Sequence, residues 1–303
     1  MNKYTTTLLS SDKKLNLSLY IQTCDKPKGI VVITHGMCEH KERYFSFIKY
    51  LCTHQFNCVI YDHRGHGESI LDTNDLGYFY DDSAKCIVED LNLVIEYAKS
   101  LFPALPCYLF AHSMGTLVSQ NYLQKYNHKI NGFISCGQPS KNPLSAIGIK
   151  VAKIIAKIKG ERHRSNLLQS MSLGAYNKGI EGTLESRWIC TDQEVVKAYM
   201  ANPKCHYVFT ANGFINLLTL LNNCYKIPYI PSNKSLPIMF IAGANDPVIE
   251  NKDKHLEAQN YMKQLGYNNV CSHLYEGLRH EILNEPNKDI VLNDILEFLI
   301  NMN

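Results

Sequence analysis

The stretch LFAHSMGTLV, residues 109–118, places a serine where a hydroxyl group can act as a nucleophile. Ser113 follows an apolar run that predicts a buried strand, and the residues after it predict a helix. At such a strand–turn–helix junction, the pattern G-x-S-x-G raises the serine above the sheet edge. Ala111 stands in place of the first glycine, which adds only one methyl group to the tight turn. We therefore predict that Ser113 is a nucleophile, with a serine that only caps the helix as the alternative.

A serine hydroxyl needs a base to accept its proton and an acid to orient that base. In parallel sheets that present such a serine, the acid and then the histidine come after later strands. Asp246 is the first acidic residue after the predicted strand 236–243. His280 lies in the loop after the last predicted strand, whereas His273 lies within that strand. We predict Asp246 as the acid and His280 as the base; the alternative for Asp246 is an ordinary turn residue before a proline.

Attack of a serine on a carbonyl carbon also requires donors for the negative charge that develops on the carbonyl oxygen. One expected donor is the backbone N–H of Met114, directly after the serine. The other is expected from the loop that begins His35-Gly36-Met37, because Gly36 allows the backbone to turn after a predicted strand. The backbone N–H groups of Met37 and Met114 are therefore the predicted oxyanion hole.

Short β-rich runs alternate with longer helical runs along most of the chain, which predicts a mostly parallel, doubly wound α/β sheet. The predicted strands are nearly continuous apolar runs, as expected when both faces of a sheet are covered. They lie at 29–36, 57–65, 106–113, 132–137, 236–243 and 269–277. The segments TTTLLS and LNLSLYIQ predict an antiparallel hairpin at the sheet edge.

Apolar residues at helical spacing predict the helices that cover this sheet. One is expected over 87–98, a second over 254–265 with Gly266 at its end, and a last one after Pro286. In the last helix, the residues expected to face inward are Ile290, Ile295, Phe298 and Leu299.

The alternation stops from about residue 139 to 232, where helices and loops between prolines predict an inserted cap. The predicted organisation is therefore a core formed by 1–138 and 233–303, with a helical cap at 139–232. A cap over the sheet edge is where substrate selection usually takes place.

Residues 144–159 of the cap predict a cationic amphipathic helix. The apolar side chains that share one face are Leu144, Ile147, Val151, Ile154, Ile155 and Ile158. Lys150, Lys153 and Lys157 lie away from that face. Two interpretations are open: the helix is a lid that contacts an anionic membrane, or its apolar face packs on the core while its lysines are solvated.

The composition is typical of a globular protein, with 45% hydrophobic residues and a net charge of +3, too small to indicate a nucleic-acid partner. The absence of a signal-peptide core and of a long apolar run predicts a cytoplasmic protein. Eleven cysteines without CxxC spacing favour reduced, mostly buried thiols. The histidine-rich segment 62–69 lacks metal-ligand spacing and predicts a loop held by hydrogen bonds of Asp62 and Arg64. No metal or cofactor is expected.

Five phrases in order, HGMCEHKERY, YDHRGHGES, AHSMG, GANDPV and GLRHEILNE, resemble the monoacylglycerol lipase and bacterial lysophospholipase branch of the α/β-hydrolases. The resemblance covers nearly the whole chain and implies the α/β-hydrolase fold with Ser113, Asp246 and His280 as a catalytic triad. It also implies that Glu39 and Arg43 line the glycerol end of the site, for which a structural ion pair is the alternative. Leu283 stands where mammalian monoacylglycerol lipases carry a second histidine, a departure from the pattern of strict glycerol recognition.

The resemblance implies a serine carboxylester hydrolase that cleaves monoacylglycerols or lysophospholipids through an acyl-enzyme on Ser113. Three other enzymes would use the same triad: a general short-chain carboxylesterase, a proline-type aminopeptidase and a lysolipid acyltransferase. A non-catalytic binding protein is the alternative from another functional class, and such proteins usually lack a member of the triad.

Overall fold

The computed structural model describes residues 2–301, which fold around a central eight-stranded sheet. The strand order is β1-β2-β4-β3-β5-β6-β7-β8, parallel from β4 to β8 with β1 and β2 antiparallel at one edge. Their bounds are Lys3–Leu9, Asn16–Gln22, Gly29–Thr34, Phe56–Tyr61, Cys107–His112, Gly132–Cys136, Ile238–Gly243 and Val270–Tyr275 for β1 to β8. The predicted mostly parallel sheet and edge hairpin are confirmed.

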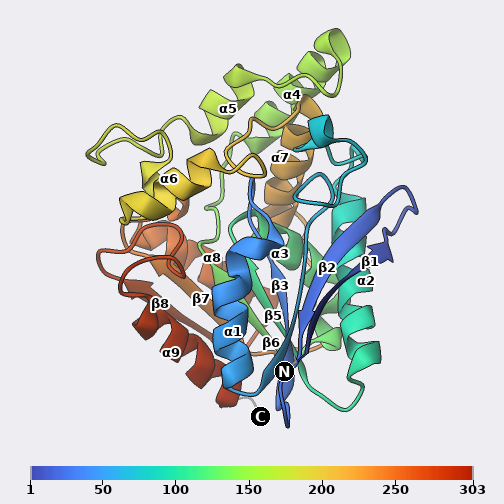
Figure 1. Ribbon diagram of the computed structural model, residues 1–303. Coiled ribbons are helices and arrows are strands. Elements are labelled where there is room, and N and C mark those ends of the chain that lie inside the picture. Colours follow the sequence, from blue (N-terminus) through green and yellow to red (C-terminus); the bar gives the residue numbers. More distant parts are fainter. Residues whose placement is uncertain (1, 302–303) are drawn as a thin grey trace.

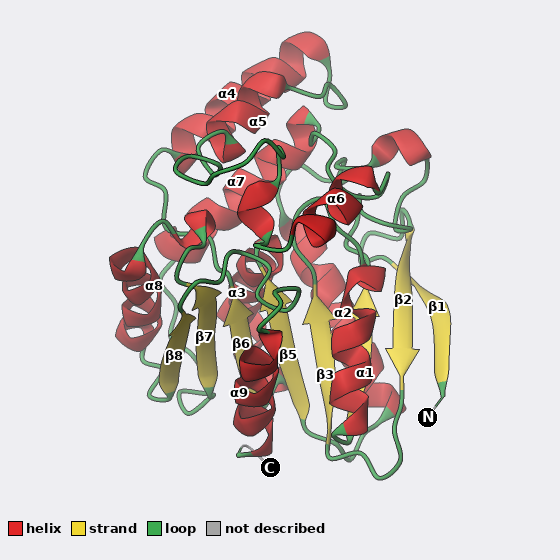
Figure 2. Cartoon of the chain, turned by 60° about the vertical axis from the view of Figure 1, so that its left-hand side comes forward, coloured by secondary structure: helices red, strands yellow, loops and turns green. Residues whose placement is uncertain are grey.

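Helices cover both faces of the sheet, as a doubly wound architecture requires (Figure 2). The helices α1 (Phe45–Thr53) and α9 (Lys288–Ile300) pack on one face. The helices α2 (Lys85–Leu101), α3 (Met114–Tyr126) and α8 (Lys252–Leu265) pack on the other. Each face is therefore buried in its own apolar core.

The ends and faces of α8 and α9 test the predicted pattern. Gly266 ends α8 in a left-handed conformation with φ of 106°, as expected of a glycine in this role. The expected inward position of Ile290 in α9 is wrong, because its side chain is 54% exposed. Val291 is buried instead and starts the row that continues through Ile295 and Leu299 at four-residue spacing.

A cap of helices lies over the carboxyl ends of the parallel strands, between β6 and β7 in the chain (Figure 1). Its helices are α4 (Ser145–Lys159), α5 (Asn166–Leu173), α6 (Gln193–Ala201) and α7 (Ala211–Lys226). The helices α4 and α7 pack against each other along much of their length. All of these elements fall within the segment 139–232 that interrupts the strand–helix alternation.

The packing of α4 corrects one interpretation of its amphipathic pattern. Its buried residues are the small Ser145, Gly148 and Ala152. The side chains of Ile147, Ile154 and Ile158 are 56%, 58% and 75% exposed, and Leu144 is exposed as well. The interpretation in which the apolar face packs on the core is therefore wrong for most of that face. Small residues allow α4 to approach α7 closely, which turns the isoleucines toward solvent.

The segment 62–69 is a hydrogen-bonded loop, as predicted. Asp62 accepts hydrogen bonds from the backbone N–H groups of Lys41 and Glu68, and Arg64 donates to Asp90 over 2.7 Å. The eleven cysteines all lie within the described residues as free thiols, and most are buried. Among residues 2–301, no helix is both long and apolar enough to cross a membrane.

Candidate active site

Ser113 joins β5 to α3 with backbone angles that a residue other than glycine seldom adopts, φ of 51° and ψ of −120°. The turn around it is tight. A Cβ atom on Gly115 would lie 2.6 Å from the carbonyl oxygen of Thr34, so this position requires glycine. Ala111 is fully buried in β5, which shows that its methyl group fits. The structure therefore has a strained turn at Ser113 with alanine in place of the first glycine.

Asp246 and His280 come together at the carboxyl ends of β7 and β8. The Nδ1 atom of His280 lies 2.8 Å from Oδ2 of Asp246, and both side chains are buried. The other carboxylate oxygen accepts the N–H of Val248 over 2.8 Å, which fixes its orientation. Gly137 leaves space for the imidazole, since a Cβ there would lie 3.1 Å from the ring. With Nδ1 donating to the carboxylate, neutral His280 has its lone pair on Nε2.

The loop after β3 approaches Ser113 closely. A Cβ atom on Gly36 would lie 3.0 Å from Cβ of Ser113, so the loop runs directly beside the serine. Met37 follows Gly36 in this loop. Met114 is the first residue of α3, where a helix leaves its N–H groups without intrahelical acceptors. The two predicted oxyanion donors are thus on segments that meet at Ser113.

A cavity of about 810 Å³ lies between the cap and the sheet. Ser113, His280, Met37 and Met114 all contribute to its wall. Much of the remaining wall is aliphatic and comes from α3, α5, α7 and the residue before α4, with side chains that include Leu117, Leu144, Leu168, Met171, Leu217, Leu218 and Leu221. A cavity of this size and composition suits an elongated apolar ligand.

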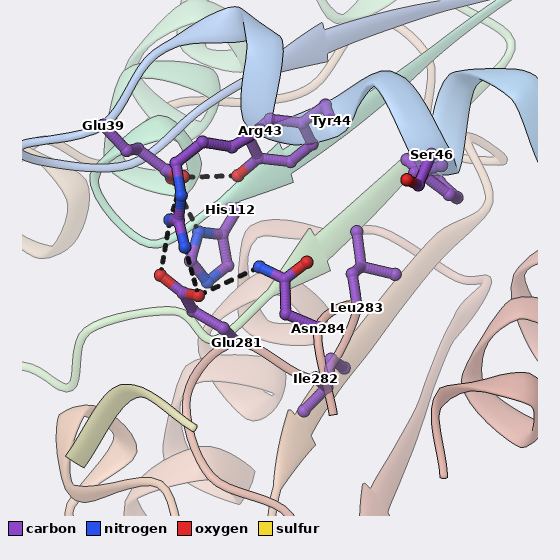
Figure 3. Close-up of a pocket in the computed structure, with 10 residues that line it drawn as sticks. Glu39, Arg43, Tyr44, Ser46, His112, Glu281, Ile282, Leu283 and Asn284 are labelled. Carbon is purple, nitrogen blue, oxygen red and sulfur yellow. Dashed lines mark hydrogen bonds and ion pairs between the residues drawn. The ribbon is translucent and has the colours of Figure 1, made fainter. Parts of the chain in front are cut away.

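Glu39, His112 and Glu281 also line this cavity, and they belong to a cluster in which charged side chains from three segments point toward one another (Figure 3). Arg43, in the 3₁₀ helix η1 (Lys41–Tyr44), donates to Glu39 over 3.0 Å and to both oxygens of Glu281 over 2.6 and 2.7 Å. The ion pair between Glu39 and Arg43 is therefore confirmed. His112 lies 3.1 Å from Glu39, and the hydroxyl of Tyr44 donates to the same carboxylate over 2.9 Å.

The protonation of this cluster follows from its contacts. Burial alone would raise the pKa of Glu39, but the hydrogen bond with His112 and the charge of Arg43 hold it well below its usual range. Burial alone would lower the pKa of His112, but the hydrogen bond to Glu39 and the charges of Glu39 and Glu281 raise it. Both shifts favour the charged forms of the two groups.

The cap is attached to the loop that carries His280 by several backbone contacts. Arg279 donates to the carbonyl oxygens of Arg187 and Cys190 over 2.7 and 3.0 Å. The N–H of Glu281 donates to the carbonyl oxygen of Ile189 over 2.7 Å. Between these contacts, the indole of Trp188 lies on the imidazole of His280, with ring centroids 5.1 Å apart.

The sequence analysis did not identify His112, Glu281 or Trp188 as residues of the site. Two of them had a local signal, because His112 precedes Ser113 and Glu281 follows His280 in the chain. Trp188 is the single tryptophan of the chain and lies in the cap. Its contact with His280 links residues 92 positions apart, which no local pattern reveals.

Known proteins similar to this chain are hydrolases. A sequence model of the hydrolase family described as "Serine aminopeptidase, S33" matches residues 25–287. A monoacylglycerol lipase of Mycolicibacterium smegmatis is 26% identical over 280 residues, which cover 90% of this chain and 89% of the relative. A probable lysophospholipase of Haemophilus influenzae is 24% identical over 304 residues, which cover 97% of this chain and 90% of the relative.

Solved structures share the fold over the full length of the chain. A carboxyl esterase from Bacillus coagulans in complex with glycerol aligns with a TM-score of 0.90 and 25% identity, covering 100% of this chain and 99% of that one. A monoglyceride lipase variant from Saccharomyces cerevisiae aligns with a TM-score of 0.78 and 19% identity, covering 100% and 96%. The chain therefore has the α/β-hydrolase fold and belongs to the serine aminopeptidase family of hydrolases.

Proposed function

We propose that the protein is a serine carboxylester hydrolase that cleaves monoacylglycerols or lysophospholipids. The observation that carries the proposal is the strained turn at Ser113 in the wall of a cavity of about 810 Å³, with the hydrogen-bonded pair of His280 and Asp246 in the same site. The names of the relatives, monoacylglycerol lipase and probable lysophospholipase, support this substrate class.

The reaction proceeds in two steps. His280 accepts the proton of Ser113 as its Oγ attacks the ester carbonyl carbon, while Asp246 holds the imidazole in the tautomer that this transfer needs. The N–H groups of Met37 and Met114 stabilise the oxyanion. His280 then gives its proton to the departing alcohol, which leaves the acyl group on Ser113. Water then attacks the carbonyl carbon of the acyl-enzyme and gives a proton to His280. His280 returns this proton to the Oγ of Ser113 as the acyl–serine bond breaks and the fatty acid leaves.

The site supports an acyl ester more directly than it defines the alcohol. The aliphatic cavity wall favours a long acyl chain over a short one. Glu39 and Arg43 are held by hydrogen bonds within the protein, so the contact of these two residues with the alcohol stays a prediction. Leu283 lines a small cavity of about 20 Å³ beside the charged cluster and offers no hydrogen bond to a headgroup.

A substrate panel tests the proposal. We expect hydrolysis of para-nitrophenyl esters to improve with chain length, and hydrolysis of monoacylglycerol or lysophosphatidylcholine to release fatty acid. Faster turnover of prolyl para-nitroanilide would instead indicate an aminopeptidase. A preference for acyl chains of two to four carbons would indicate a general esterase, because such short chains gain little from a largely apolar cavity. Transfer of the acyl group to a lysolipid would indicate an acyltransferase. A fluorophosphonate that labels the wild type but not Ser113→Ala would exclude a non-catalytic binding protein.

We further propose that the exposed face of α4 rests on an anionic membrane. Its exposed isoleucines and leucine adjoin the lysines of the same helix, the combination of an interfacial helix. Leu144 and Met171 are more than half exposed and also line the large cavity, so the apolar surface continues into the site. A lipid ester would then enter the cavity directly from the bilayer.

Binding to vesicles that contain phosphatidylserine tests this contact. Because each lysine near an anionic surface contributes about 1 kcal/mol, replacing Lys150, Lys153 and Lys157 by Gln should weaken binding roughly 100-fold. The exposed Lys3, Lys26 and Lys28 lie at the end of the sheet opposite the cap. Replacing them by Gln is the matched control and should leave binding unchanged. Equal loss in the two triple variants, or no binding by the wild type, would exclude the contact.

A further inference from the structure

His112 lies between two hydrogen-bond acceptors from different loops. Its Nδ1 atom is 3.1 Å from Oε1 of Glu39, in the loop after β3, and its Nε2 atom is 3.3 Å from the carbonyl oxygen of His280. The residue is buried, and its ring lies beside the imidazole of His280, with centroids 4.6 Å apart. His112 therefore connects the loop of the expected oxyanion hole to the loop of the expected base.

The partners of Glu39 determine which group carries the proton. Its carboxylate accepts hydrogen bonds from the N–H of Gly36, the hydroxyl of Tyr44 and the guanidinium of Arg43, in addition to the contact with His112. A carboxylate surrounded by donors is ionised, so it can only accept from His112. The carbonyl oxygen of His280 can also only accept. Both ring nitrogens of His112 must then donate, which requires the imidazolium.

Charge balance in the cluster supports the same assignment. Glu39 and Glu281 supply two negative charges, and Arg43 supplies one positive charge. An imidazolium at His112 makes the cluster neutral, whereas a neutral ring would leave one buried negative charge uncompensated. The raised pKa of His112 agrees with this assignment.

We propose that protonated His112 is a positioning residue that holds the loop of His280 against the loop after β3, so that the active arrangement depends on the proton of His112. This inference rests on the proposed ester hydrolase function. Loss of the proton removes one of the two donors, and either Glu39 or the carbonyl oxygen of His280 then loses its partner. The base and the oxyanion donors would no longer be fixed relative to each other.

The other groups that face His112 do not lose protons at the same alkaline pH. Arg43, from η1, has a pKa raised well above its usual value by Glu281 and Glu39, although burial opposes the shift. Burial and the neighbouring Glu39 raise the pKa of Tyr44 well above its usual value. Glu39 is held as a carboxylate by its hydrogen bonds and by the charge of Arg43, and Glu281 accepts two hydrogen bonds from Arg43. The ring of His280 also faces His112, but as the proposed base it works in its neutral form, so it cannot cause an alkaline loss of activity. Among the groups that face it, His112 is therefore the one whose loss of a proton would lower activity as the pH rises.

The pH dependence of kcat/KM for a para-nitrophenyl ester tests the proposal on the full chain. The wild type should lose activity at alkaline pH, and His112→Gln, which has no titrating group, should lack this alkaline decline. In the plateau, His112→Gln should be about tenfold slower, because the amide presents its NH2 group to one of the two acceptors and its carbonyl oxygen to the other. The exposed His273 provides the control variant His273→Gln, which should keep the wild-type profile. An identical alkaline decline in His112→Gln and the wild type would overturn the proposal.

Nitrogen-15 NMR of the histidine rings gives a readout that needs no turnover. The resonances lost in His112→Gln identify His112, and in the wild type they should show two protonated ring nitrogens at pH 7. If they show this while no ester is hydrolysed, the assignment of His112 stands and the proposed function fails. A neutral His112 at pH 7, or full activity at a pH where His112 has lost its proton, would overturn the positioning role.

Discussion

Two buried histidine–carboxylate pairs lie side by side at the carboxyl end of the sheet, and the surroundings of the two imidazoles favour different numbers of ring protons. His280 is 2.8 Å from Asp246, and His112 is 3.1 Å from Glu39. Both rings line the large cavity, but His280 is bound to its carboxylate through Nδ1, whereas His112 has an acceptor at each of its ring nitrogens. A carboxylate partner alone therefore does not make a histidine a base.

The second ring contact decides the chemistry. A histidine with one acceptor can keep a lone pair on its other nitrogen and exchange a proton there. A histidine with two acceptors is held as a cation and can connect segments, but it has no lone pair for a substrate. We therefore expect His280 to transfer the proton and His112 to act by positioning, although both lie close to Ser113 in space or in sequence.

The largest contrast is expected between variants of the two histidines. Because a triad acts as a unit, His280→Gln should lower kcat/KM for esters by about 10⁴ to 10⁶, as should Ser113→Ala. His112→Gln should retain most of this catalysis, since it removes a positioning contact and leaves the lone pair of His280. Steady-state kinetics on matched substrates checks both values. Comparable losses in His112→Gln and His280→Gln would remove the distinction between the pairs.

Variants of the two carboxylates should differ in kcat in the same direction as variants of the two histidines, but by a smaller factor. In Asp246→Asn, the amide can donate to Nδ1 of His280 and move the ring proton to Nε2, which should lower kcat by about 10³ to 10⁴. Glu39→Gln leaves the tautomer of His280 unchanged, so the loss of kcat should be at least tenfold smaller. Burst-phase measurements of acylation separate these effects from changes in product release. A larger loss in Glu39→Gln would place the essential acid in the other pair.

The sequence predicted the first pair because its signals are local. Ser113 and Gly115 form a short pattern at a strand–helix junction, and Asp246 and His280 each follow an apolar strand. The second pair joins His112 to Glu39, 73 positions apart, through contacts that exist only after the sheet forms. Periodicity likewise identified the apolar face of α4 but not the face by which α4 packs on α7. The signal for that face was the small size of Gly148 and Ala152, and a pattern based on large apolar residues does not detect it.

The pair of Glu39 and His112 should also contribute to the stability of the fold. Glu39→Gln should reduce the free energy of unfolding by about 3 to 5 kcal/mol near pH 7, because it leaves one buried positive charge of the cluster uncompensated. The pKa of Glu39 is lowered in the folded state, so its stabilising contribution is present above its ordinary value of 4.5 and is lost as the pH falls below it. Denaturant unfolding at pH 7 and at successively lower pH measures the difference, which should shrink on acidification. A difference that grows with acid would contradict the ionised state of Glu39.

The smallest expected effect concerns the other side of the His280 ring. Trp188 covers the imidazole with ring centroids 5.1 Å apart, while His112 lies at 4.6 Å, so His280 is held between the cap and the second pair. Trp188→Leu should lower kcat/KM by about tenfold, because the base becomes less well oriented, whereas Trp188→Phe keeps a flat ring and should stay near the wild type. The loop contacts of Arg279 with the backbone of Arg187 and Cys190 remain in both variants. Equal activity of the Leu and Phe variants would mean that those backbone contacts alone orient His280, and that the indole serves only to exclude water.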